Sequence, residues 1–284
     1  MKIKVIITMI LMILLSACGS KSKDQKSDVK ILGLKGKVKS IKYMTYNAEL
    51  KFGAIKKGEQ SNSKENNKYF NFNENEIKIE DGEYISYDQI QIKRLYIYND
   101  KNILTQTSGY NLNGDFLGKL TYEIDSQGDL IETNDFNSKN EFMGKTIYTR
   151  DNNGNAIETN IYDSMGNLKS KFTSDHDSKG RILESIYYDS NGELLEKKYI
   201  KYDNKGRIIE RKLIIDTSIF IQNFKYDNKE TDDLTVMIKS ENYSIISETI
   251  YTYKYDKNGN WIEKISIEDE VPKIIVEREI EYYM

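Results

Sequence analysis

His176 is the first residue to test for acid–base chemistry, because it is the only histidine of the chain and histidine titrates near neutral pH. It occupies the position that Ile124, Arg150 and Tyr202 hold in neighbouring repeats. A substituted surface position therefore explains it better than general-base catalysis. Structural zinc sites need several His or Cys ligands, and the chain has one of each. The composition predicts no catalytic site, no metal site and no cofactor.

Acidic residues offer two further candidate sites, one for calcium binding and one for glycoside hydrolysis. The segment 151–155 with Glu158 suggests a calcium loop, but Gly154 comes two residues too early for an EF-hand, and Lys205 in an equivalent turn would repel a cation. Asp232 and Asp233 form a carboxylate pair of the kind that a glycosidase uses. With 45 acidic residues in the chain, one such pair is weak evidence. The sequence indicates a protein that is not an enzyme.

Cys18 is the one residue with a specific covalent chemistry. Lys2 and Lys4 precede an apolar run over 5–15, which is too short for a membrane-spanning helix and typical of a secretory signal. The segment Leu15-Ser-Ala-Cys18 resembles the lipobox of bacterial lipoproteins. The resemblance implies cleavage before Cys18 and acylation of that residue, which would anchor the chain to a membrane through two or more acyl chains. An ordinary signal peptide with a chance cysteine is the alternative.

Composition and charge limit the partners of the remaining chain. Residues 19–30 are polar and lack an apolar period, so they are expected to form a flexible tether between lipid and body. The formal net charge of −3 argues against nucleic acid, which requires a basic stripe. The 22 tyrosines and the single proline favour strands.

A 26-residue repeat dominates the middle of the chain. Each unit holds two turns that close on Gly or Asn, with spacings that alternate between 12 and 14 residues. Asp or Asn opens most of these turns and can bond the backbone, while the closing residue can adopt a left-handed conformation, so the pattern predicts antiparallel hairpins. The closing residues are Asn102, Gly114, Gly128, Asn140, Gly154, Gly166, Gly180, Gly192 and Gly206, and Gly259 closes a similar turn later in the chain.

Two charged series keep the same phase. Because side chains alternate faces with period two, a 26-residue unit returns each series to one face of the sheet. A four-residue loop over 137–140 would place Glu132 directly opposite Lys145, whereas a three-residue loop would put them on opposite faces. A solvated charge ladder is favoured over a binding role. The series are Lys119, Lys145, Lys171 and Lys197, and Glu132, Glu158, Glu184 and Glu210.

The fold class expected is all-β: an antiparallel meander of repeated hairpins that forms a twisted or curled sheet after the signal peptide. The segment 53–75 is polar and predicts a long loop. The chain divides into a signal peptide (1–17), a lipidated tether (18–30), an N-terminal β segment (31–97), the hairpin repeats (98–213) and a divergent C-terminal β segment (214–284).

The turn motifs also resemble a known family. Tyr188-Asp-Ser-Asn-Gly192, Tyr202-Asp-Asn-Lys-Gly206 and Tyr255-Asp-Lys-Asn-Gly259 resemble the YD repeats of RHS-type proteins, whose repeats build a curling β-sheet shell. The segment 259–263 with 278–283 is similar to uncharacterised lipoproteins of Bacteroidetes-like bacteria. This second resemblance implies a location and an architecture but no activity.

The function expected from the sequence is that of a non-catalytic binding or structural lipoprotein of the cell envelope. Its partners would be the membrane, through the lipid on Cys18, and an envelope protein or a glycan. An outer-membrane location follows if the cell is Gram-negative, with the body periplasmic or surface-exposed. The alternative is a component of a toxin or contact-inhibition locus, either an immunity protein or a shell fragment, which the YD-like repeats suggest.

Overall fold

The computed structural model describes residues 27–61, 67–86, 89–227 and 234–284. Within these residues the chain forms one short helix, α2 (Asp28–Ile31), and 19 strands. The strands are β1 (Val38–Lys51), β2 (Ala54–Gln60), β3 (Lys68–Phe72), β4 (Lys78–Ser86), β5 (Gln89–Tyr98), β6 (Leu104–Asn111), β7 (Phe116–Ile124), β8 (Leu130–Asn137), β9 (Phe142–Arg150), β10 (Ala156–Asp163), β11 (Leu168–His176), β12 (Ile182–Asp189), β13 (Leu194–Tyr202), β14 (Ile208–Ile215), β15 (Ser218–Tyr226), β16 (Leu234–Glu241), β17 (Ser244–Tyr255), β18 (Trp261–Glu268) and β19 (Val271–Tyr282).

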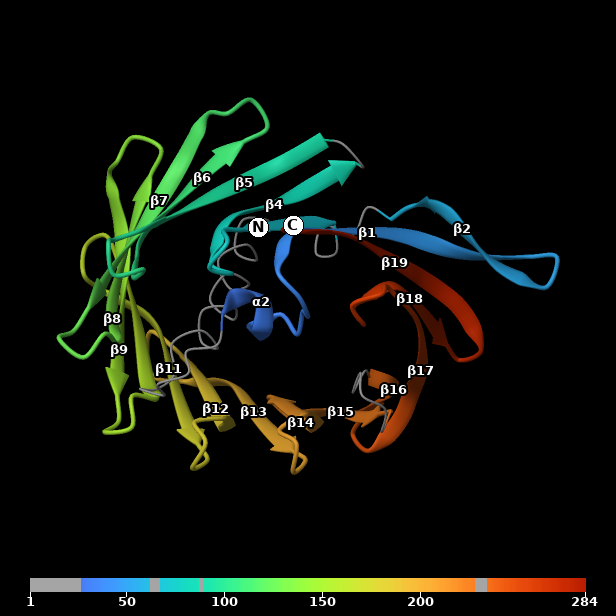
Figure 1. The fold of residues 1–284 in the computed structure, drawn as a ribbon. Coiled ribbons are helices and arrows are strands. Elements are labelled where there is room, and N and C mark those ends of the chain that lie inside the picture. The colour runs from blue at the N-terminus through green and yellow to red at the C-terminus, as the bar shows by residue number, and fades with distance from the viewer. Residues whose placement is uncertain (1–26, 62–66, 87–88, 228–233) are drawn as a thin grey trace.

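The sheet closes into a barrel. From β3 to β19 each described strand pairs antiparallel with the next, and β1 pairs with both β19 and β3, which completes a ring of 18 strands (Figure 1). The expected twisted or curled sheet is therefore wrong, although the all-β class is confirmed. Closure satisfies the backbone groups that an open sheet would leave unpaired at its two edges.

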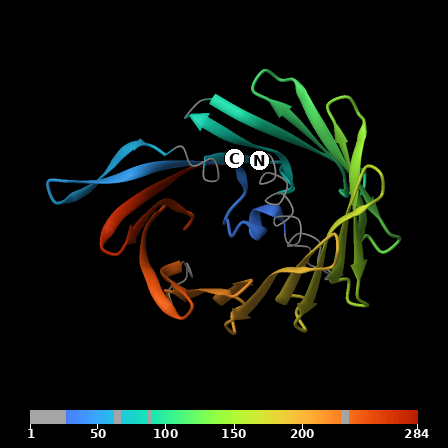
Figure 2. The same ribbon diagram turned by 180° about the vertical axis from the view of Figure 1, so that it is seen from behind.

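The segment 53–75 also differs from expectation. Instead of one long loop it contains β2 and β3. β2 pairs with β1 in a hairpin that projects from the barrel wall (Figure 2), and β3 pairs with β1 as one of the strands of the ring. Charged residues are compatible with a strand in β2 because Lys56, Lys57 and Glu59 are exposed there, whereas β3 has no exposed residue.

The repeated turns share one geometry. In the turn that Asp177 opens, its Oδ1 accepts hydrogen bonds from the backbone N–H groups of Lys179 (2.9 Å) and Arg181 (3.0 Å). The N–H of Gly180 donates to the Asp177 carbonyl at 3.0 Å, and Gly180 has φ of +75°. Glycine adopts this left-handed conformation at little cost. The Asp and Gly positions of the repeat are therefore turn residues.

A bulge in each repeat hairpin sets the register. In the hairpin of β8 and β9, Phe136 pairs with Phe142 but Asp135 pairs with Gly144, so Met143 is an extra residue. Lys145 consequently lies opposite Asn134 and diagonal to Glu132. Neither loop-length alternative is correct. The loop between the paired Phe136 and Phe142 is one residue longer than 137–140, and the bulge at Met143 adds a second extra residue to β9. The two additions restore the parity of the strand, and Lys145 and Glu132 share a face.

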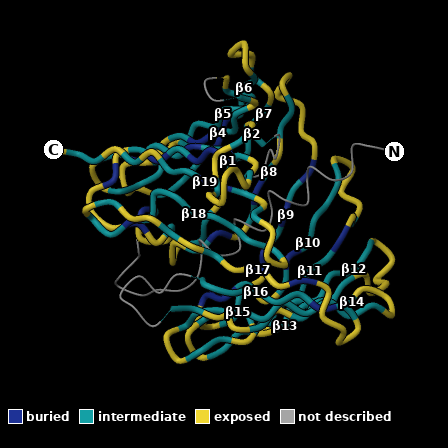
Figure 3. Tube along the Cα trace, turned by 90° about the vertical axis from the view of Figure 1, so that its right-hand side faces the viewer, coloured by how far each residue is buried: buried dark blue, intermediate teal, exposed yellow. Residues whose placement is uncertain are grey.

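The two ends of the barrel differ in what they contact. We call the end contacted by α2 and the residues after it the plugged rim, because Asp28 Oδ2 accepts from the Lys78 backbone N–H (2.7 Å) and the Lys35 N–H donates to Asn260 Oδ1 (2.8 Å). Its turns that the structure describes in full are 73–77, 99–103, 125–129, 151–155, 177–181, 203–207 and 256–260. The opposite end is the far rim, with turns 111–115, 137–141, 163–167, 189–193, 216–217, 242–243 and 269–270. Exposed residues gather in the turns of the barrel (Figure 3).

Side chains tie neighbouring hairpins together at the plugged rim. Four tyrosine hydroxyls each donate to a backbone carbonyl on the preceding strand: Tyr98 to Lys78, Tyr202 to Ile182, Tyr226 to Ile208 and Tyr253 to Leu234, at 2.7 to 3.0 Å. Arg150 makes the same link through Nε to Leu130 at 2.9 Å. We call these residues the clasps. They account for the tyrosine that precedes Asp203 in the YD-like motif.

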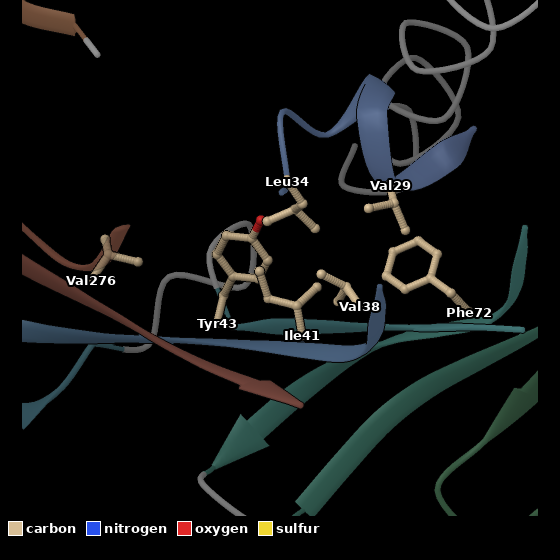
Figure 4. Packing of buried hydrophobic residues seen from close by; sticks show 7 residues of the cluster. All are labelled: Val29, Leu34, Val38, Ile41, Tyr43, Phe72 and Val276. Carbon is tan, nitrogen blue, oxygen red and sulfur yellow. The ribbon is translucent and has the colours of Figure 1, made fainter. Parts of the chain in front are cut away.

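The apolar core lies inside the ring, between the N-terminal segment and the wall of β1, β3 and β19. Val29 of α2 packs with Phe72, and Leu34 packs near Ile41 and Tyr43 (Figure 4). Val29, Ile41 and Phe72 are at most 1 % exposed. Residues 27–30, which were expected to belong to the flexible tether, thus form part of the described body, where the Ser27 side chain accepts from the Lys30 backbone N–H at the start of α2.

Candidate functional site

The strand register separates an inner from an outer face of the barrel. Ile41 and Tyr43 point to α2 and belong to the inner face, and residues paired directly across strands share a face. Following the pairs around the ring places Asp81, Arg94 and Thr133 inside. It places the predicted lysine and glutamate series outside.

The structure brings six of the eight ladder residues into three ion pairs. Lys145 Nζ lies 2.9 Å from Glu132, Lys171 Nζ lies 2.6 Å from Glu158, and Lys197 Nζ lies 3.3 Å from Glu184. Glu210 instead pairs with Lys201 at 2.9 Å, and the Lys119 ammonium lies 5.3 Å from the centre of the Phe136 ring. Such exposed pairs stabilise a protein by at most about 1 kcal/mol each. They make the outer face strongly polar.

A buried ionic cluster lies on the inner face near the plugged rim. Asp81 is 5 % exposed, and its Oδ1 accepts from Arg94 Nε at 2.6 Å. Its Oδ2 accepts from the Tyr96 hydroxyl (2.6 Å) and Lys78 Nζ (3.2 Å), while Arg94 also donates both Nη groups to Glu83 at 3.1 Å.

The cluster suits a structural role better than a chemical one. Burial, and then the negative charge of Asp81, raise the pKa of Tyr96 above its usual value. Burial alone would lower the pKa of Arg94, but the Asp81 carboxylate beside it raises it. Both groups therefore stay protonated at neutral pH and hold their positions as donors. Asp81 is paired on both oxygens, so it is poorly placed to accept a substrate proton.

An aromatic row crosses the inner face of the repeat wall. Tyr148 pairs with Thr159, Thr159 with Phe172, and Phe172 with Tyr187, so these four side chains lie side by side across β9 to β12. The rings of Phe172 and Tyr187 stack with centroids 4.4 Å apart. Tyr148 and Thr159 are buried, whereas Phe172 and Tyr187 are half-buried and so still contact solvent within the barrel.

The environment of Asp135 also indicates that solvent reaches this wall. Asp135 lies on the inner face opposite Gly144, and its residue surface is exposed. Partial burial of the carboxyl raises its pKa, although the Phe136 N–H and the charge of Lys169 act in the opposite direction. A solvated carboxylate inside the ring contrasts with the dry packing around α2.

The plugged rim carries a groove where one clasp is missing. Ile124 stands in the position that Tyr98 and Tyr202 hold in other units. The groove has a volume of about 540 Å³ and is lined by Ile103, Ile124 and the polar residues of turns 99–103 and 125–129. It is wide open to solvent and is a weaker candidate than the inner wall.

Other residues singled out in the sequence do not assemble into a site. His176 occupies the clasp position of β11 and is half-buried, so the expected surface position is only partly correct. Asp151 bonds the backbone of its own turn and the side chain of Asn155. Among the described residues no group of three or more His, Cys, Asp or Glu could hold a metal ion. Cys18, Asp232 and Asp233 lie outside the described residues.

The inner wall and the clasps were missed by sequence reasoning. The clasp position was visible as the residue before each turn of the plugged rim, in the series Tyr98, Ile124, Arg150, His176 and Tyr202. Its inward direction was not visible, because the direction depends on the bulges. In the described residues no helix is long and apolar enough to cross a membrane.

Comparisons with known proteins give only distant structural likenesses. No family model and no curated protein matches the sequence. A porin-like protein from Bacteroides uniformis aligns over 86 % of this chain and 98 % of its own, with 12 % identity and a TM-score of 0.47. A porin-like protein from Bacteroides vulgatus aligns over 84 % and 97 %, with 12 % identity and a TM-score of 0.36.

A structure of TcdB2-TccC3 aligns over 70 % of this chain and 16 % of its own, with 10 % identity and a TM-score of 0.24. At these values no activity, ligand or family follows from the alignments. The barrel rests on the strand pairings of this chain itself.

Proposed function

We propose that this chain is a lipid-anchored, non-catalytic barrel of the cell envelope that binds a glycan on its inner wall. The aromatic row of Tyr148, Thr159, Phe172 and Tyr187 carries the proposal. Aromatic faces combined with hydroxyl groups suit sugar rings, which present both apolar faces and hydrogen-bonding groups. The half-burial of Phe172 and Tyr187 leaves their surfaces accessible to such a ligand.

The charge pattern of the outer face supports a barrel body that stands in water. Lys145 and Lys171 lie within β9 and β11 and form ion pairs on that face. A lysine or arginine at the lipid-facing midplane of a membrane barrel costs about 2–4 kcal/mol. A lipid on Cys18 would therefore provide the attachment, with the body outside the bilayer.

The length of the N-terminal segment gives the anchored barrel an orientation. Cys18 precedes Ser27 by nine residues, and a fully extended chain spans at most about 3.6 Å per residue. Ser27 lies at the plugged rim, where its hydroxyl donates to the Glu76 carboxylate. The plugged rim would accordingly face the membrane and the far rim would face away from it.

Ligand binding is tested on a glycan array with the purified mature protein. The Phe172→Ala/Tyr187→Ala variant should lose at least tenfold in affinity for any glycan that the wild type binds. Tyr162→Ala/Tyr188→Ala is the matched control, because these tyrosines lie on the outer face. Thermal unfolding checks that both variants remain folded. Equal binding by both variants would place the glycan elsewhere, and no binding to any glycan would contradict the proposal.

The anchor is tested separately by feeding cells an alkyne-bearing fatty acid. Wild-type protein should carry the label and the Cys18→Ala variant should not. Label retained in that variant would contradict lipidation at Cys18 without bearing on the inner wall.

A further inference from the structure

The far rim differs from the plugged rim in the number of large apolar side chains that it exposes. Among the described residues, its turns carry Leu112 (49 % exposed), Met165 (82 %) and Tyr243 (68 %). More exposed apolar residues lie within the first three positions of strands that follow far-rim turns. They are Leu117, Phe142, Met143, Leu194, Leu195, Ile245, Ile246 and Val271. In the plugged-rim turns, the apolar side chains Ile77 and Ile103 are half-buried. The strand positions that follow plugged-rim turns are exposed only to 37–41 % at Ile79, Ile131, Ile157, Leu183 and Ile209.

The far rim is also acidic. Within the seven far-rim turns that the structure describes in full, eight carboxylates stand against one lysine, Lys139. The seven plugged-rim turns given above hold nine carboxylates and six basic residues, a net charge of −3 (6 − 9) compared with −7 (1 − 8) in the far-rim turns. The far-rim carboxylates are Asp115, Glu141, Asp163, Asp189, Glu193, Asp216, Asp269 and Glu270. Backbone and side-chain hydrogen bonds to Asp163 lower its pKa, which keeps it charged at neutral pH.

From these two properties we propose that the far rim is the docking surface for a polypeptide segment that is both basic and amphipathic. Apolar patches ringed by charge mark interaction sites, and complementary charge sets which partner is accepted. A partner with Lys or Arg beside an apolar face would cover exposed apolar residues on neighbouring far-rim hairpins while its cations meet the carboxylates.

Charge also argues against the other occupants of this surface. A second copy of the chain would bring two sets of eight carboxylates together, and like charges across an interface oppose association. Anionic lipid head groups would be repelled in the same way. If the lipid is on Cys18, the far rim points away from the membrane, where a partner protein can reach it. The orientation rests on the proposed function, but the docking surface itself does not.

The test measures binding of two fluorescent 18-residue peptides to the mature protein by anisotropy. One peptide places Leu and Lys in helical amphipathic spacing, and the other replaces each Lys with Glu. We expect the Lys peptide to bind, with an affinity that falls as salt is raised, and the Glu peptide to bind at least tenfold more weakly. Equal binding of the two peptides, or no binding of the Lys peptide, would overturn the proposal.

Matched variants locate the site on the molecule. Leu112→Ser/Met165→Ser/Tyr243→Ser and Glu193→Gln/Asp269→Asn/Glu270→Gln should each weaken binding of the Lys peptide at least tenfold. Ile131→Ser/Ile157→Ser/Leu183→Ser and Glu74→Gln/Asp100→Asn/Asp129→Asn are the plugged-rim controls and should leave binding within twofold. Circular dichroism confirms that each variant is folded. Equal losses from the two rims would show general attraction to an acidic protein and would also overturn the proposal.

Two further measurements separate the excluded occupants. Sedimentation velocity of the wild type is expected to show a monomer, and flotation with anionic lipid vesicles is expected to leave the non-lipidated Cys18→Ala protein unbound. A dimer or a vesicle-bound fraction that disappears in the Leu112→Ser/Met165→Ser/Tyr243→Ser variant would assign the surface to a second copy or to lipid instead. Glycan binding to the inner wall is unaffected by any of these results, so the two proposals fail independently.

Discussion

The plugged rim and the far rim are built from the same turn, yet they differ in what surrounds each turn. At the plugged rim a methyl group on Gly180 would lie 2.7 Å from Asn155, and one on Gly206 would lie 3.3 Å from Arg181. At the far rim Gly114, Gly166 and Gly192 have no atom within 4 Å of that position. The turns of Gly180 and Gly206 thus contact their neighbours, although the turn of Gly128 beside the groove does not, whereas the far-rim turns stand apart with apolar tips exposed. One local geometry serves stability at one end and supplies a recognition surface at the other.

Arginine residues strengthen the plugged rim further. Arg181 stacks on Tyr202, with 4.5 Å between the guanidinium and the ring centre, and Arg207 stacks on Tyr226 at 4.7 Å. Each arginine also donates from Nε to the aspartate that opens its own turn. These contacts run from one hairpin to the next and explain why an arginine follows the glycine in these two turns.

The largest effect expected from this comparison concerns apolar packing. Phe72→Ala should destabilise the protein by about 3–5 kcal/mol, because it opens a cavity between the barrel wall and Val29. Phe142→Ala at the far rim removes a ring that is 39 % exposed and should cost about 1 kcal/mol or less. Urea denaturation measures both free energies of unfolding. Similar losses for the two variants would mean that α2 does not contribute a packed core.

A smaller difference is expected from the turn glycines. Gly180→Ala and Gly192→Ala both force alanine into a left-handed conformation, which costs about 1–2 kcal/mol. Gly180→Ala should cost about 1 kcal/mol more, since its new methyl group crowds the Asn155 side chain. Midpoints of urea denaturation give the comparison. Equal costs at the two positions would argue that neighbouring plugged-rim turns do not restrain one another.

The clasps should contribute less than the glycines. Tyr202→Phe removes one hydrogen bond to the Ile182 carbonyl, and such a bond contributes about 0.5–1.5 kcal/mol. Tyr243→Phe at the far rim alters an exposed hydroxyl and should change stability by a few tenths of a kcal/mol. Hydrogen exchange at the Ile182 end of β12 should accelerate in Tyr202→Phe alone. Unchanged exchange there would show that the clasp does not join the hairpins.

The repeat made the local structure predictable, because the spacing of Gly154, Gly166 and Gly180 fixes where each hairpin turns. Register was not predictable: the extra residue at Met143 leaves no mark in the sequence, and it decides that Lys145 lies diagonal to Glu132. Closure was not predictable either. It depends on the pairing of β1 with β19, whose residues are more than 200 positions apart.

The aromatic row on the inner face was also predictable only in part from the sequence. Tyr148 and Tyr187 were visible as strand residues, but which face they occupy follows from two bulges and from α2 marking the inside. The strands β2 and β3 were hidden for a different reason. Their charged and polar residues do not alternate clearly with apolar ones, so the periodicity that marks a strand is weak.

The smallest effect concerns His176, which stands in the clasp position where Tyr202 donates a hydrogen bond. Its Nδ1 is buried and has no hydrogen-bond partner among the described residues. Burial lowers the pKa of His176, while the charges of Asp151, Asp175 and Asp177 partly offset that shift. Because the folded pKa lies below the unfolded one, the folded state binds a proton less readily. The contribution of neutral His176 to the free energy of unfolding is fully present above about pH 6.5 and decreases as the pH falls through the folded pKa.

His176→Tyr isolates this contribution, because tyrosine does not titrate in that range and is the residue that other units place at the clasp. Free energies of unfolding at pH 7.5 and pH 5.5 should fall more on acidification for the wild type than for the variant. The variant should also be more stable at pH 7.5 if its hydroxyl reaches the preceding strand as that of Tyr202 does. A wild type that gains stability on acidification relative to the variant would show that the three aspartates outweigh burial, and His176 would then be a second cationic residue at the clasp positions, beside Arg150.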